Sequence, residues 1–183
     1  MKAKLAIILA AMAAAAYGDG TSLRGKASLW VQAEHSKTTG TTVVSATYPD
    51  KLLNYAFRNG TNDYQMTALV VRTIELSGLS TNIVDLQAET NAFGDAVTFT
   101  RVNLLCVSSR TNSAGKVIVG GDNFSAIFND DDAAASALLP GGSVVFAAPV
   151  GGYEAGASDR NLKLSTPTTN AATVDIYIGG VAE

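Results

Sequence analysis

From Leu23 onward the sequence is a series of short runs in which apolar and polar residues alternate, separated by Gly, Pro and Asn turns. In Asn161–Thr166 the alternation places Leu162 and Leu164 on one side, and Thr173–Ile178 follows the same pattern. A period of two residues is typical of strands with one buried face. This part of the sequence has no amphipathic pattern long enough for a three-turn helix. We therefore predict an all-β chain folded as an antiparallel β-sandwich that resembles a jelly roll.

The strand signals differ in strength along the chain. Val97–Ser108 carries the clearest one, and there we expect even-numbered residues to face the core and odd-numbered residues to face away. The inward set is Val102, Leu104 and Cys106, and the outward set is Arg101 and Asn103. Lys51–Phe57 fits a short strand or one or two helical turns equally well. The other expected strands are Ala27–Ala33, Thr41–Val44, Gln65–Leu76, Ile83–Leu86, Lys116–Val119 and Ser143–Ala147.

Residues 1–20 differ from the rest of the chain. Lys2 and Lys4 precede an unbroken apolar run, Leu5–Ala16, whose alanines and leucines favour a helix. The run is too short for a membrane span. It fits either a secretory signal peptide cleaved near residue 16 or a retained helix that docks on the body of the protein or on a neighbouring subunit. In the second case its large apolar residues would form an assembly surface: Leu5, Ile7, Ile8, Leu9 and Met12.

We therefore divide the chain into three parts. Residues 1–20 form the apolar helix or signal peptide, residues 21–75 an N-terminal arm with strands, and residues 76–183 the sandwich core. The last two parts together suit about one domain, because the chain has 183 residues and no linker rich in Pro or Ser.

The scarcity of certain residue types excludes several classes of protein. One Cys excludes an intramolecular disulfide framework and a Cys-rich zinc site, and one His excludes a His-cluster metal site. The net charge is 13 − 16 = −3, so the sequence offers no basic face for nucleic acid. No cofactor is expected.

Two short motifs could carry chemistry, and each has a simpler structural explanation. Asp130, Asp131 and Asp132 form the densest run of oxygen ligands and are a weak candidate for calcium. Their spacing does not match an EF-hand, and Asp132 could instead cap a short helix in the alanine stretch that follows. His35 lies between Glu34 and Ser36, but neighbours on a strand point to opposite faces and do not form a triad. We predict no catalytic residues.

Several pieces of the C-terminal part occur in a familiar order. They are Val84-Asp85-Leu86, Asn91 to Val102, Val117 to Gly121, Leu139 to Val144, Ala147-Ala148-Pro149, Gly152-Tyr153, Asn161 to Leu164 and Val174 to Gly179. Over residues 76–180 this ordered set resembles small, uncharacterised structural proteins of tailed phages and prophages. Thr100 and Val174 depart from the usual pattern, and neither change threatens a strand.

The resemblance implies a non-enzymatic virion protein, either a head decoration or minor capsid protein or a tail component. Its partners would be further copies of itself, forming a homo-oligomer, and the major capsid or tail protein. Neither nucleic acid nor a membrane would be a partner in the mature assembly. The alternative hypothesis is a secreted or periplasmic bacterial β-sandwich that binds glycans or another surface, with residues 1–16 removed.

Overall fold

The computed structural model describes residues 4–9, 25–39, 42–47, 51–120, 125–128, 135–156 and 158–183. These residues form antiparallel β-structure with one short helix, which confirms the prediction of an all-β fold. The chain divides into two compact units, which we call the ribbon unit (residues 1–58) and the sandwich unit (residues 59–183).

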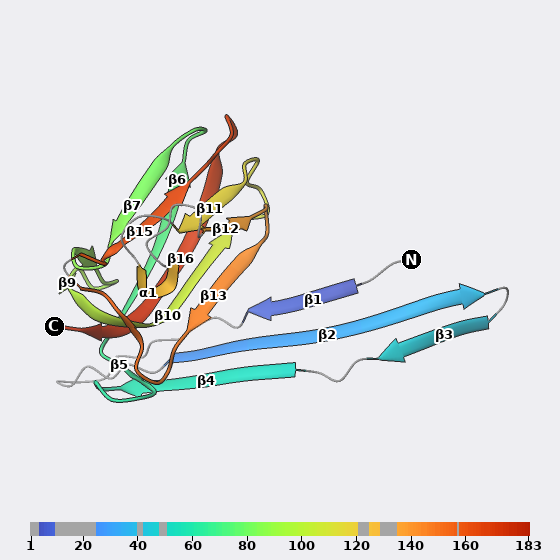
Figure 1. Cartoon of the computed structure of the whole chain (residues 1–183), viewed down its shortest axis with the longest axis horizontal. Helices are drawn as coiled ribbons and strands as arrows, with labels where there is room; N and C mark the ends of the chain where they lie inside the picture. The colour runs from blue at the N-terminus through green and yellow to red at the C-terminus, as the bar shows by residue number, and fades with distance from the viewer. Residues whose placement is uncertain are drawn as a thin grey trace. The chain divides into compact units, whose positions relative to one another are not determined.

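The ribbon unit is organised around one long strand, β2 (Gly25–Thr39). Its 15 residues span about 50 Å at ~3.4 Å per residue. Strands β3 (Thr42–Thr47) and β4 (Lys51–Asn59) pair in turn with its C-terminal and N-terminal halves (Figure 1). Strand β1 (Lys4–Leu9) pairs with residues 29–34 of β2. Because residues 29–31 pair with both β1 and β4, those two strands lie on opposite edges of β2.

The helix predicted for residues 1–20 is not confirmed. Lys4–Leu9 is a strand, in which every residue from Lys4 to Leu9 has a partner on β2. Helix propensities differ by less than about 1 kcal/mol per residue, so pairing with a neighbouring strand readily outweighs them. The β-branched Ile7 and Ile8 also suit a strand. Residues 10–24, which hold the alanine run, lie outside the described residues.

The sandwich unit contains a five-stranded and a four-stranded antiparallel sheet. The first has the order β13 (Ser143–Ala147), β10 (Phe99–Ser109), β16 (Ala172–Ala182), β6 (Ala68–Leu76). The second has the order β12 (Ala135–Leu138), β11 (Val117–Gly120), β15 (Asn161–Ser165), β7 (Thr81–Asp85). The shorter elements are β5 (Gln65–Met66) and helix α1 (Ser125–Phe128). Strands β8 (Glu89–Thr90) and β9 (Ala96–Val97) pair with each other and form the β8–β9 hairpin. Strand β14 (Tyr153–Glu154) pairs with β10 in the first sheet.

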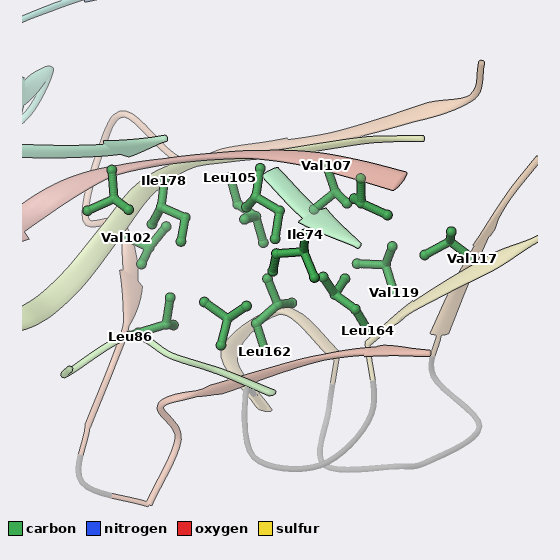
Figure 2. Packing of buried hydrophobic residues seen from close by; sticks show 14 of the residues in the cluster. Ile74, Leu86, Val102, Leu105, Val107, Val117, Val119, Leu162, Leu164 and Ile178 are labelled. Atoms are coloured by element: carbon green, nitrogen blue, oxygen red, sulfur yellow. The ribbon is translucent and has the colours of Figure 1, made fainter. Parts of the chain in front are cut away.

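The core lies between the two sheets. Figure 2 shows Leu105, Val107 and Ile178 of the first sheet facing Leu162 and Leu164 of the second. The residues predicted to point inward in β15 and β16 are all completely buried: Leu162, Leu164, Val174, Ile176 and Ile178. Each such side chain contributes about 1.5–3 kcal/mol relative to leaving it exposed, so this facing set holds the two sheets together.

The predicted alternation in Val97–Ser108 is wrong because β10 is bulged. Its register against β16 shifts between Phe99 and Arg101 and again between Val102 and Leu104. Each shift reverses the side to which the following residues point. Val102, Leu105 and Val107 therefore belong to the core between the sheets, and Asn103, expected to face away, is completely buried.

Strand β16 continues through Gly179 and Gly180 to Ala182, beyond the alternating segment Thr173–Ile178 that the sequence predicted. A Cβ atom at Gly180 would lie 2.1 Å from the backbone oxygen of Arg101 on β10. The glycine is therefore needed for the close approach of two central strands, not to stop one.

The alanine stretch after the acidic run is also β-structure where it is described. Ala135–Leu138 forms β12 and pairs with β11, which corrects the short helix considered for this stretch. Four residues give too few helical hydrogen bonds to compete with pairing to an existing strand. Residues 129–134 lie outside the described residues.

Candidate functional site

A buried ion pair lies at the β6 edge of the sandwich. The Nη1 atom of Arg72 on β6 is 2.7 Å from Oε1 of Glu89 on β8. Only 4% of Glu89 is exposed, whereas the Arg72 side chain is 42% exposed. Burial raises the pKa of Glu89, and the charge and hydrogen bond of Arg72 oppose that rise. The ion pair of Arg72 with Glu89 therefore connects the β8–β9 hairpin to β6, an edge strand of the first sheet.

A second arginine–carboxylate pair lies in the adjoining loops. The Nε atom of Arg160 is 3.5 Å from Oδ1 of Asp85, and Arg160 donates a 3.4 Å hydrogen bond to Gln87. The Gln87 amide in turn donates to the backbone oxygen of Ala155 at 3.0 Å. Asp85 and Glu89 are thus each balanced by an arginine of their own, an arrangement that fastens loops to strands.

We expect the Glu89→Gln substitution to change how stability depends on pH. The raised pKa of Glu89 means that folding favours its protonated form. Glu89 therefore contributes most to the free energy of unfolding below its ordinary pKa of 4.5. That contribution is lost as the pH rises through the higher pKa that Glu89 has in the folded protein. Urea unfolding at several pH values should show the advantage of wild type over the variant shrinking from pH 4.5 upward.

The control for this experiment is Glu75→Gln, which changes an exposed carboxylate on β6, the strand that carries Arg72. It should alter stability by less than about 0.5 kcal/mol at each pH. An advantage of wild type over Glu89→Gln that grows with pH would contradict the prediction, since the attraction to Arg72 would then outweigh the cost of burial.

A hydrogen-bonded network crosses the outer face of the first sheet. Arg110 donates to both carboxylate oxygens of Asp175 on β16, at 2.8 and 2.7 Å, and to Thr73 on β6 at 3.1 Å. Thr73 also donates to Asp175 at 2.7 Å. The hydrogen bond from Arg110, followed by that from Thr73, lowers the pKa of Asp175. The network is exposed and binds two neighbouring strands and the loop after β10 to each other.

Cys106 is buried, as the sequence predicted. It is 5% exposed, on the side of β10 away from the core between the sheets, and burial raises its pKa from 9.0 to about 11. A reactive thiol needs a lowered pKa and access to solvent. This environment favours an unreactive thiol.

We expect Cys106 to react with a disulfide reagent only when the sandwich unit opens. The pKa shift alone reduces the thiolate fraction about a hundredfold near pH 8, and burial slows the reaction further. Absorbance measurements should show labelling in buffer at least about a hundredfold slower than in urea. A matched control, Val71→Cys in a Cys106→Ala chain, should label rapidly because Val71 is 51% exposed. Comparable rates for the two thiols would contradict this.

One loop presents an aromatic side chain to solvent. Phe93 is 69% exposed at the tip of the turn between β8 and β9. The Asn91 side-chain oxygen accepts hydrogen bonds from the backbone of Phe93 and Asp95, and its amide donates to the Asp95 carboxylate. Asp95 is therefore held within this turn, and it does not join Asp85 and Glu89 in one cluster.

The residues singled out for assembly fall into separate places. In the register of β1, Leu5, Ile7 and Leu9 pair with Ala33, Val31 and Leu29 of β2, and Ile8 pairs with Trp30. Met12 lies outside the described residues, as do the calcium candidates Asp130, Asp131 and Asp132. Those assignments stay predictions. His35 is on β2 and pairs with Ala46 of β3.

Sequence reasoning did not find the arginine pairs. Arg72 and Glu89 are 17 residues apart, and Arg110 and Asp175 are 65 apart. Only strand order and register bring such residues together, so a single sequence carries no signal for them beyond their charge.

In the part of the chain that the structure describes, no three His, Cys, Asp or Glu residues form a group suited to a metal ion. Within the same ranges no helix has the length and hydropathy needed to cross a lipid bilayer. No family model, curated protein sequence or solved structure matches this chain.

Proposed function

We propose that the sandwich unit is a jelly roll. Its eight main strands lie in two antiparallel sheets, in the orders β13-β10-β16-β6 and β12-β11-β15-β7, with the short β14 beside β10 in the first. Following the chain through these strands, each connection leads to the opposite sheet except the one from β11 to β12. Eight strands wound between two sheets in this way are the mark of a jelly roll, a fold that recurs in viral capsid and lectin domains.

We propose further that the protein is a non-enzymatic component of a tailed-phage virion, on the head surface, as a minor capsid protein, or in the tail. The strand order of the sandwich unit is the observation that carries this proposal. Fold alone does not fix function, and the resemblance of residues 76–180 to phage structural proteins supports the same assignment. In this role it packs against copies of itself and against the major capsid or tail protein.

The ribbon unit supports an assembly role. Strand β2 spans about 50 Å, compared with roughly 17–20 Å for a common strand. Its pairing with β1, β3 and β4 stiffens most of that length. A stiff ribbon of this length can reach a neighbouring subunit.

Peptide mass spectrometry of purified phage particles from the source strain tests the proposal. We expect the chain in DNA-filled particles, at a fixed ratio to the major capsid protein, with its N-terminus at residue 1 or 2. Its absence from particles, or a mature N-terminus at Tyr17 in the secreted fraction, would overturn the virion assignment.

A secreted binding module is the alternative function, and the same strand order favours it because lectins also use jelly rolls. A glycan array tests this directly with the purified chain. Trp30, the one tryptophan of the chain, is a candidate for stacking on a sugar. Binding that is lost in Trp30→Ala and kept in Trp30→Phe would support a glycan-binding function over the virion proposal.

A further inference from the structure

The four edge strands of the sandwich differ in how well they resist pairing with another chain. Edge strands are commonly protected by charges, by inward-pointing charged residues or by being very short. Strand β6 carries Arg72 and Glu75, β7 carries Asp85, and β12 has four residues. Strand β13 has none of these protections: its sequence Ser-Val-Val-Phe-Ala is uncharged, as is the whole segment from Pro140 to Val150.

Among the strands that the structure describes, β13 pairs on one side with β10 and on the other side with none. Hydrogen bonds from Ser109 to Gly142 and from Ala148 to Asn103, both 2.9 Å, fix the phase of its antiparallel pairing with β10. Because backbone groups alternate between the two sides of a strand, Val144 and Phe146 bond toward β10. The N–H and C=O groups of Ser143, Val145 and Ala147 therefore point away from β10.

The side chains of β13 alternate between the core and the outer face of the first sheet. Val144 and Phe146 pack against the core, and Phe146 makes an edge-on contact with Phe128 at 5.3 Å between ring centroids. On the outer face, the register aligns four residues across the sheet: Val145, Cys106, Tyr177 and Val71. This apolar row ends at Val145, on the free edge.

We infer that β13 pairs with β13 of a second copy of this chain, antiparallel about a twofold axis at Val145. Ser143 of each copy then lies opposite Ala147 of the other, and about six backbone hydrogen bonds form between the strands. The inference rests on the proposed function, since it names the surface through which the protein packs against itself.

Three features favour a second copy over a different partner. An uncharged strand places no like charges opposite each other across a twofold axis. The apolar row of one copy continues into the same row of the second copy, and the two sheets that contain β13 join into one continuous sheet. Pro149 has no N–H to donate, so the hydrogen-bonded ladder between the two copies ends before it. The paired segment is therefore the same in both copies.

Sedimentation analysis of the full chain tests this surface. We expect a weak dimer near 100 µM, as suits a small interface. Val145→Lys places two positive charges opposite each other and should weaken dimerisation at least about tenfold, with an unchanged melting temperature. Ile83→Lys, which puts the same charge on the exposed face of edge strand β7, should leave the dimer intact. A monomeric wild type, or a Val145→Lys chain that still dimerises, would overturn the inference.

Amide hydrogen exchange locates the contact independently of any variant. Raising the protein concentration should protect the amides of Ser143, Val145 and Ala147. Those of Val144 and Phe146, which already bond to β10, should be protected at every concentration. Protection confined to other segments would show that a different surface assembles the protein.

The two proposals fail in different experiments. A β13 dimer in solution from a chain that is absent from particles would refute the virion role and leave the edge pairing standing. A chain present in particles whose β13 amides never become protected would refute the edge pairing alone.

Discussion

Replacing Gly180 by alanine is expected to destabilise the sandwich unit by about 3 kcal/mol or more, because central strands tolerate overpacking poorly. The added Cβ atom would lie 2.1 Å from the backbone oxygen of Arg101 and 3.1 Å from a ring carbon of Phe99. Backbone atoms of a central strand cannot move aside as a flexible side chain can, so β16 and β10 must separate locally. Urea unfolding, followed by far-UV circular dichroism and Cys106 labelling, measures the loss.

Gly156→Ala is the matched control, since a Cβ atom there would meet no other atom within 4 Å. This variant should match wild type within about 0.5 kcal/mol. If the two substitutions cost the same, the close approach of β16 and β10 at Gly180 would not determine stability.

Replacing Phe99 by alanine is the second change with a large expected effect. Among the residues whose side chains the structure describes, Phe99 is the largest that is completely buried, and it begins β10 within the core cluster. Removing a buried phenylalanine ring costs about 3–5 kcal/mol, because apolar burial is lost and a cavity remains. This is a large part of the 5–15 kcal/mol that stabilises a typical domain. We expect a clear fall in the urea midpoint with little change in the slope of the transition.

Phe93→Ala makes the same chemical change at a side chain that is 69% exposed. Its cost should stay within about 0.5 kcal/mol. Phe99→Leu, which keeps most of the apolar volume, gives a second measurement if the alanine variant fails to fold. An equal cost for Phe93 and Phe99 would contradict the packing described for the core.

The strands with one buried face were predictable from the sequence. Ser143–Ala147 has the predicted bounds, and the inward residues of β15 and β16 were identified correctly. Those strands keep a strict period of two because one side lies on the core and the other does not. Because this alternation of apolar and polar residues follows burial directly, the buried residues can be predicted without any knowledge of the partner strands.

The failures come from features that alternation does not encode. A bulge depends on the register between two strands, so Val97–Ser108 looked regular while the structure shifts its phase twice. Pairing with β2 and β11 also outweighed the helix preference of Lys4–Leu9 and of Ala135–Leu138. In both places a contact distant in sequence decided the local structure.

The candidate sites were less predictable than the fold. The ion pair of Arg72 with Glu89 and the bidentate pair of Arg110 with Asp175 depend on strand order, which a single sequence does not give. Burial of Cys106 was predicted correctly, although the side of β10 on which it lies was not. The sheet order is also needed to identify β13 as an uncharged edge strand, because only that order shows that β13 pairs along its length with a single described strand, β10.

The position of β16 has a consequence for the order of events during synthesis. It is the last of the eight strands to leave the ribosome, yet it lies between β10 and β6 and pairs with both along most of its length. Until it emerges, β10 and β6 expose unpaired edges to solvent and to other nascent chains. Folding of the sandwich unit therefore has to wait for residues 172–182.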